Sequence, residues 1–150
     1  MAVTISLYSH VPKLFANKDV TLTTLKVMLL DNTATFVAAN TTVDAVAGAG
    51  PTRAKELFGF GWVQGGPTLA SVAVTQAAIT DATVNDAKLT ATDVDVVASG
   101  GSITGYNALI YDSTGQYPLC FISFGQLQSA GDTTDFKIRF NANGIINWTQ

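Results

Sequence analysis

Short apolar runs separated by turn residues dominate the chain after residue 55, at a spacing of about 8–12 residues. Within runs such as "TLASVAVTQAAI" and "DAKLTATDVDVVA", apolar and small polar residues alternate, which is typical of half-buried strands. An earlier run, "TTLKVMLLD", is apolar enough for a core strand, whereas "HVPKLFANKDV" is expected to hold one or two helical turns. The pattern predicts an all-β fold of about nine strands with one short N-terminal helix: an antiparallel β-sandwich or jelly-roll-like barrel.

Two short segments carry the signals of tight turns between strands. "DSTGQ" separates "ITGYNALIY" from "YPLCFISFG", and Gly115 is expected at the position that needs a positive φ. "NANG" separates "DFKIRF" from "IINWT", and Asn143-Gly144 is a strong hairpin signal. The sequence therefore predicts two hairpins in the C-terminal third of the chain.

The stretch "GFGWVQGGPTLASVAVT", from Gly59 to Thr75, holds four glycines within its first eight positions. A phosphate-binding loop would place a strand before the glycines and a helix after them, with free backbone N–H groups pointing at the anion. Here an alternating, β-branched run follows, and no Gly-Lys-Ser/Thr is present. We interpret the stretch as a bend that leads into a strand.

Composition narrows the classes of function. The 150 residues are 47% apolar and only 13% charged. The net charge is −3, and the eight Lys and Arg residues are scattered along the chain. Nucleic-acid binding normally requires a basic stripe, and a membrane span requires a long apolar run, so we expect neither partner. A surface so poor in charge favours packing against other proteins. The length predicts a single domain over residues 1–150.

Residues that commonly carry chemistry are few. His10 and Cys120 are the only histidine and cysteine, so they cannot complete a zinc site, and we interpret Cys120 as a buried apolar residue. Asp93 and Asp95 lie two residues apart on one strand face, where two carboxylates can bind Ca²⁺ or act as acid and base. Their alternation with valines is more typical of a half-exposed strand. We expect no enzyme activity, no metal and no cofactor.

Two further groups have structural and functional interpretations. Asp132 and Asp135, in "AGDTTDF", are expected to be turn residues that accept backbone N–H groups rather than metal ligands. Exposed aromatic rings can form a sugar-stacking platform, although the number of rings is ordinary for a sandwich core. The candidates for such a platform are Trp62, Tyr106, Tyr111, Tyr117 and Trp148.

The order of five segments along the chain is more informative than any one of them. The segments are "TISLYSHVPKLFANKDVTLTTLKVMLLDN", "GFGWVQGGPTLASVAVT", "AKLTATDVDV", "ALIYDSTGQYPLCFISFG" and "GDTTDFKIRFNANGIINW". This order resembles a family of small tailed-bacteriophage virion proteins that includes head decoration, or cement, proteins. The resemblance runs from about Thr4 to Trp148 and rests on turn glycines and core strands. Cys120, Ser123 and Phe140 depart from the family pattern.

The resemblance implies a β-sandwich that coats the head of a tailed phage and stabilises its capsid lattice. The implied partners are the major capsid protein and further copies of the chain, as a dimer or trimer. The implied location is the capsid surface of the virion, after synthesis in the host cytoplasm without a signal peptide. A tail or fibre component and a carbohydrate-binding module of the virion are the alternatives.

The N-terminal arm, about residues 1–11, is the candidate interaction segment. Its apolar residues are Val3, Ile5, Leu7 and Tyr8, and it carries no charged side chain. An apolar strand at the end of a chain either completes its own sheet or adds to the edge of a neighbour's sheet. For a lattice protein we favour pairing with a neighbouring chain.

Overall fold

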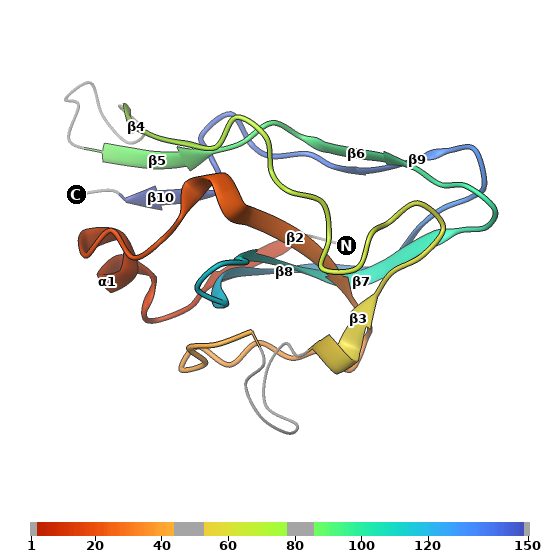
Figure 1. Ribbon diagram of the computed structural model, residues 1–150, viewed down its shortest axis with the longest axis horizontal. Coiled ribbons are helices and arrows are strands. Elements are labelled where there is room, and N and C mark those ends of the chain that lie inside the picture. The colour runs from red at the N-terminus through yellow and green to blue at the C-terminus, as the bar shows by residue number, and fades with distance from the viewer. Residues whose placement is uncertain (1–2, 44–52, 78–85, 149–150) are drawn as a thin grey trace.

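A computed structural model describes residues 3–43, 53–77 and 86–148, which form two packed layers of antiparallel strands (Figure 1). One layer is a five-stranded sheet in the order β1-β8-β7-β2-β3. The other layer consists of a three-stranded sheet, β10-β5-β4, beside a two-stranded sheet, β6-β9. The prediction of an all-β antiparallel fold is confirmed and the arrangement is sandwich-like, whereas a jelly-roll topology stays a prediction.

The described part of the chain contains ten strands and three short helices. The strands are β1 (Thr4–Leu7), β2 (Leu25–Leu30), β3 (Glu56–Leu57), β4 (Ala73–Ala77), β5 (Asp86–Thr90), β6 (Val94–Val97), β7 (Ile103–Asp112), β8 (Tyr117–Ala130), β9 (Asp135–Ile138) and β10 (Ile146–Trp148). The helices are α1 (Val11–Ala16) and the 3-10 turns η1 (Leu22–Thr24) and η2 (Arg53–Lys55). The predicted N-terminal helix is therefore present, with a proline in its first turn. No described helix is both long enough and apolar enough to cross a membrane.

The core is centred on β2 and β7, two of the three inner strands of the five-stranded sheet. In β2 every residue except Lys26 is buried, because side chains on both faces of the sheet are covered. The other layer covers one face, and the segment after β2 covers the opposite face, where Phe36 packs on the rings of Tyr8 and Phe121. Burial on both faces explains why the run is continuously apolar rather than alternating.

The glycine stretch is a structural bend. After the glycines the chain runs beside β2: the Val27 amide donates to the Pro67 carbonyl at 3.2 Å, and Leu69 donates to Leu25 at 2.8 Å. Gly66 touches β2 so closely that a Cβ on it would lie 1.7 Å from the Val27 carbonyl oxygen. Regular pairing begins only with β4 at Ala73, a few residues later than the alternation suggests. The interpretation as a bend that leads into a strand is confirmed.

The hairpin predicted at "DSTGQ" is confirmed, since β7 and β8 pair down to Asp112 and Tyr117. The role expected of Gly115 is wrong, because Gln116 has the positive φ of 56°. Gly115 is required for space instead: a Cβ there would lie 2.2 Å from the ring of Tyr117. The side-chain Nε2 of Gln116 donates to the Ser113 carbonyl at 2.6 Å, which helps to hold the residue in this conformation.

The hairpin predicted at "NANG" is wrong. The segment makes a tight turn, in which Gly144 has a φ of 96° and donates to the Asn141 carbonyl at 2.8 Å. The strands on either side do not pair with each other, because β9 pairs with β6 and β10 pairs with β5. The turn therefore carries the chain from one small sheet to the next within the same layer (Figure 1).

The N-terminal strand completes its own sheet, so the expectation that it pairs with a neighbouring chain instead of within its own domain is wrong. β1 pairs antiparallel with β8, with Thr4 opposite Ser123 and Leu7 opposite Cys120. Two features account for this: β8 is long enough to offer a free edge, and Tyr8 is buried in the core directly after β1. Residues 1 and 2 of the predicted arm lie outside the described residues.

Candidate interaction surface

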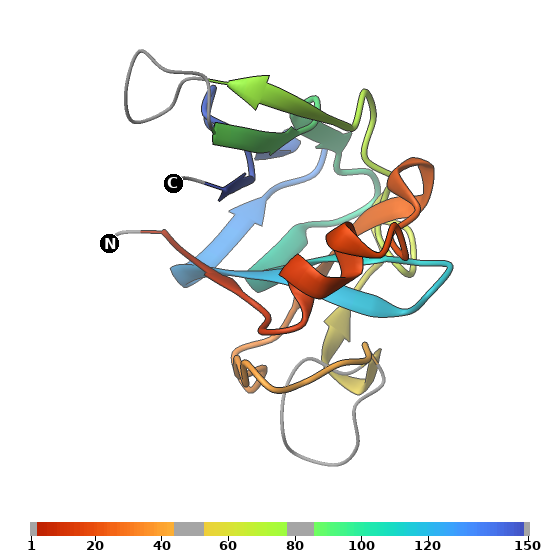
Figure 2. The same cartoon turned by 90° about the vertical axis from the view of Figure 1, so that its left-hand side faces the viewer.

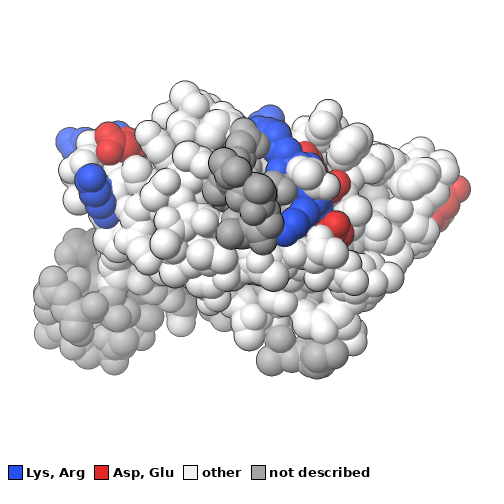
Figure 3. Space-filling view, turned by 90° about the horizontal axis from the view of Figure 1, so that it is seen from below, with Lys and Arg blue, Asp and Glu red and all other residues white. Residues whose placement is uncertain are grey.

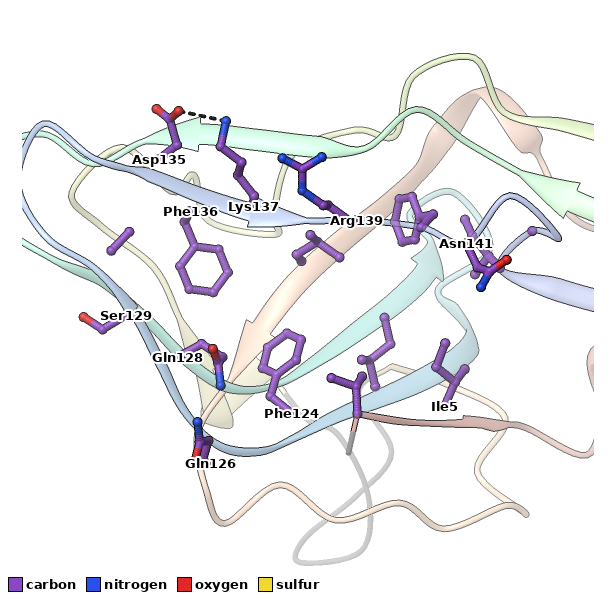
Figure 4. A pocket seen from close by; sticks show the side chains of 17 residues that line it. Ile5, Phe124, Gln126, Gln128, Ser129, Asp135, Phe136, Lys137, Arg139 and Asn141 are labelled. Carbon is purple, nitrogen blue, oxygen red and sulfur yellow. Dashed lines mark ion pairs between the residues drawn. The ribbon is translucent and has the colours of Figure 1, made fainter. Parts of the chain in front are cut away.

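A cleft of about 630 Å³ opens between the two layers, along the side where β1 and β9 are the outer strands (Figure 4). β1 and β8 form its floor, β9 and the segment after it form its roof, and the turn before β10 closes one end. Nine of the 17 residues that line it are apolar, so apolar side chains of a partner can be buried there. The apolar lining residues are Val3, Ile5, Ile122, Phe124, Ala130, Phe136, Ile138, Phe140 and Ile145.

The charged side chains on the roof of the cleft are paired. Lys137 contacts Asp95 at 2.6 Å and Asp135 at 2.9 Å. The hydrogen bonds to these two carboxylates raise the pKa of Lys137 above its usual value. Arg139 lies 3.8 Å from Asp93, whose other oxygen accepts the Phe140 amide at 2.8 Å. The charged side chains of the roof therefore lie in ion pairs, and the floor below holds Gln126, Gln128 and Ser129 besides its apolar residues.

The same contacts decide between the two interpretations of Asp93 and Asp95. The side chains face Arg139 and Lys137 across the β6–β9 pair, and Asp95 is opposite Lys137 in register. The half-exposed strand is confirmed. No three described His, Cys, Asp or Glu side chains form a group suited to a metal ion.

β1 forms the outer edge of the cleft and exposes three apolar side chains: Val3, Ile5 and Leu7, of which Ile5 is 51% exposed. Tyr8 is buried and does not belong to this surface. The Tyr8 amide donates to the Leu119 carbonyl at 3.2 Å, so by alternation the amides of Ile5 and Leu7 point away from β8. Within residues 4–7 the edge has no charge, proline or bulge, the usual devices that prevent another strand from pairing.

A second hollow of about 370 Å³ continues the cleft along β1 toward β10. It is lined by Ile5 and Leu7 on one side and by Asn141, Gly144, Ile146 and Asn147 on the other. We call the two hollows together with the outer edge of β1 the β1 groove. The groove combines unpaired backbone groups with a neighbouring apolar lining, the two features by which proteins bind an extended segment.

His10 and Cys120 do not form a reactive pair of the kind a nucleophilic enzyme needs. Cys120 is fully buried in β8, and burial raises the pKa of its thiol to about 12, so the thiol stays protonated at neutral pH. The His10 ring packs near the rings of Tyr8 and Tyr117, and burial lowers its pKa. The interpretation of Cys120 as a buried apolar residue is confirmed.

The two turn aspartates and the aromatic rings suggested for a sugar-stacking platform do not form a common site. Asp132 accepts the Gly100 amide at 2.8 Å, as expected of a turn residue, whereas Asp135 begins β9 and pairs with Lys137, so the turn role expected of it is wrong. Trp62 and Tyr111 are buried, which removes them from a sugar-stacking platform. Trp62 packs on Phe136 in the core, whereas Trp148 packs on Phe15 beside α1.

Charged side chains occupy only small groups on the face seen in Figure 3, and most of that face is uncharged. This agrees with the low charged fraction of the sequence. Val3, Ile5 and Leu7 of the predicted interaction segment lie in the β1 groove, whereas the residues of its roof were not predicted. The alternation in "DFKIRF" places Phe136, Ile138 and Phe140 on one strand face and was the available signal.

Comparison of the chain with protein families, with curated proteins and with solved structures finds no match in any of the three. Function is therefore inferred from the geometry of the β1 groove.

Proposed function

We propose that this chain is a non-enzymatic structural protein of a tailed-phage virion, which binds the outside of the head and stabilises the capsid lattice. The observation that carries the proposal is the unprotected, uncharged edge of β1 beside an apolar cleft. A soluble monomer normally protects such an edge strand from pairing with another chain, whereas an assembly protein needs an edge that can pair. The resemblance of the segment order to head decoration proteins supports the same assignment.

In this mechanism an extended segment of the major capsid protein adds to the sheet as a strand beside β1. Its backbone bonds to the outward amides and carbonyls of Ile5 and Leu7, and its apolar side chains enter the cleft over Phe124. Each Å² of apolar surface buried contributes about 25 cal/mol. The affinity of a single contact is modest, but copies that also bind one another attach to a lattice with higher avidity.

Immunogold labelling of intact phage particles tests the proposal, with antibodies raised against the purified chain. We expect label over the heads of the phage whose genome encodes the chain. Label confined to the tail would support the alternative of a tail or fibre component. Particles free of the chain by both labelling and mass spectrometry would overturn a virion role altogether.

A further inference from the structure

The turn from Gly59 to Trp62 holds a phenylalanine in a backbone conformation that disfavours it. Gly59 and Trp62 exchange two backbone hydrogen bonds, of 2.8 and 3.0 Å, around a two-residue turn in which Phe60 has a φ of 54° and Gly61 a φ of 101°. Such turns prefer Asn or Gly at the first central position, because a Cβ is crowded at positive φ. A strained residue that is not glycine suggests a role for its side chain.

The surrounding structure fixes this turn rigidly. The Ser99 amide donates to the Phe60 carbonyl at 2.9 Å, and a Cβ on Gly61 would lie 2.5 Å from the Val97 carbonyl oxygen. The Phe60 ring lies over Gly101, where a Cβ would be 2.4 Å from the ring. Trp62 anchors the turn in the core. Phe60 is nevertheless 51% exposed, so the turn presents a rigid aromatic knob.

The knob has apolar neighbours and one anion nearby. Phe58, Val63 and Val97 are also more than half exposed, and Asp132 binds Gly100 in the adjacent turn. The link between β6 and β7, against which the knob packs, lies at one end of the long axis of the molecule (Figure 1). The knob therefore lies near that end.

At the opposite end of the long axis α1 lies beneath the sheet β10-β5-β4 (Figure 2). Residues of α1, of this sheet and of the segment after α1 line an apolar hollow of about 400 Å³ there. Phe15 and Trp148 meet there edge to face, with ring centres 4.9 Å apart. Among the described residues that line the hollow, Lys18 is the only charged one. The full lining is Phe15, Lys18, Val20, Leu22, Val74, Ala87 and Trp148.

We propose that copies of this chain associate head to tail, with Phe60 of one copy seated in the hollow between Phe15 and Trp148 of the next. The knob and the hollow match in chemistry: an exposed ring meets an open aromatic cluster that has room for a third ring. Their charges are complementary as well, since Asp132 beside the knob meets Lys18 beside the hollow. The contact joins two different surfaces, so it continues from copy to copy. It uses no residue of the β1 groove.

Sedimentation equilibrium of the purified chain over a concentration series tests this contact. We expect concentration-dependent association of the wild type. Phe60→Asn removes the ring and places at positive φ a residue that tolerates it, so the variant folds but associates about 10- to 100-fold more weakly. Val74→Glu puts a charge in the hollow and has the same effect. Leu127→Asn, at an exposed site on β8 outside the knob and the hollow, is the control and associates as the wild type does.

Mixing the two variants distinguishes a head-to-tail contact from a symmetric one. Phe60→Asn retains its hollow and Val74→Glu retains its knob, so the mixture forms a heterodimer that does not grow further. A monomeric wild type, unweakened association of either folded variant, or a mixture that stays monomeric would each overturn the proposal.

Circular dichroism melts establish that each variant folds. If Phe60→Asn does not fold, Phe60→Gly takes its place as the knob variant. If Val74→Glu does not fold, Lys18→Glu takes its place as the hollow variant. If the head-to-tail contact is disproved, the proposal of capsid binding through β1 still stands, because that binding is measured in a separate experiment.

Discussion

Gly66 shows how one missing side chain fixes the path of the chain over the core. The backbone passes so close to β2 that no larger residue fits at this position. Neighbouring polar groups hold the same segment: the Glu56 carboxylate accepts the Gly65 amide, and the Tyr111 hydroxyl donates to the Gly65 carbonyl at 2.8 Å. The glycine-rich bend is thus pinned from several sides, which provides a rigid base for the knob at Phe60.

Substitution of Gly66 by alanine tests this requirement for space. Gly66 and Gly100 have almost the same φ, 76° and 75°, but nothing lies within 4 Å of a Cβ built on Gly100. We expect Gly100→Ala to lower the free energy of unfolding by about 1 kcal/mol, the cost of the left-handed conformation alone. Gly66→Ala adds the clash with Val27 and costs about 3 kcal/mol or more. Urea unfolding measures both, and equal losses would contradict the close contact.

Buried acidic groups make the fold sensitive to alkali. Burial raises the pKa of the Cys120 thiol to about 12 and that of the Tyr8 hydroxyl above its usual value. Above pH 9 the unfolded chain loses the thiol proton while the folded chain keeps it, so ionisation favours the unfolded state. We expect the free energy of unfolding to fall between pH 9 and 11, by up to about 1.4 kcal/mol per pH unit for each such group.

Cys120→Ala separates the contribution of the thiol. The variant is less stable at every pH because it leaves a cavity, but its loss of stability above pH 9 is shallower than that of the wild type. Urea unfolding at several pH values measures the slopes. Identical slopes would show that the thiol does not contribute.

Among the elements, β1 differs along its two edges. One edge bonds to β8 and the other is open, so the amides of alternate residues face β8 or the open edge. Ile5→Pro removes an outward amide, and we expect it to lower the free energy of unfolding by no more than about 1 kcal/mol. Ser6→Pro removes an amide that faces β8 and costs about 2–3 kcal/mol. Equal losses would contradict the pairing of β1 with β8.

The elements that could be predicted from the sequence are those whose signal is local. The apolar run of β2 and the turn between β7 and β8 are examples, since burial and hairpin geometry determine their residues directly. The pairing of β9 and β10 could not be predicted from "NANG", because the same turn residues also suit a crossing between two sheets. The partner of β1 depended on a free edge of β8, which only the tertiary structure reveals.

At the scale of the whole molecule, the low charge of the sequence corresponds to three separate apolar surfaces. The β1 groove lies along one side of the sandwich, and the knob and hollow occupy the two ends of its long axis. The composition predicted association but not its location. Val3, Ile5 and Leu7 were accessible to sequence reasoning as an uncharged N-terminal strand, whereas Phe60 resembled an ordinary core aromatic until its φ and exposure were known.

Rebinding to stripped capsids is the most direct test of the central claim that the β1 groove attaches the chain to a phage head. Capsids of the encoding phage are freed of the chain by mild denaturant and then cosedimented with purified wild type or Ile5→Pro. We predict saturable binding of the wild type and loss of binding by Ile5→Pro, although that variant remains folded. Absence of wild-type binding, or equal binding of the two proteins, would contradict the account.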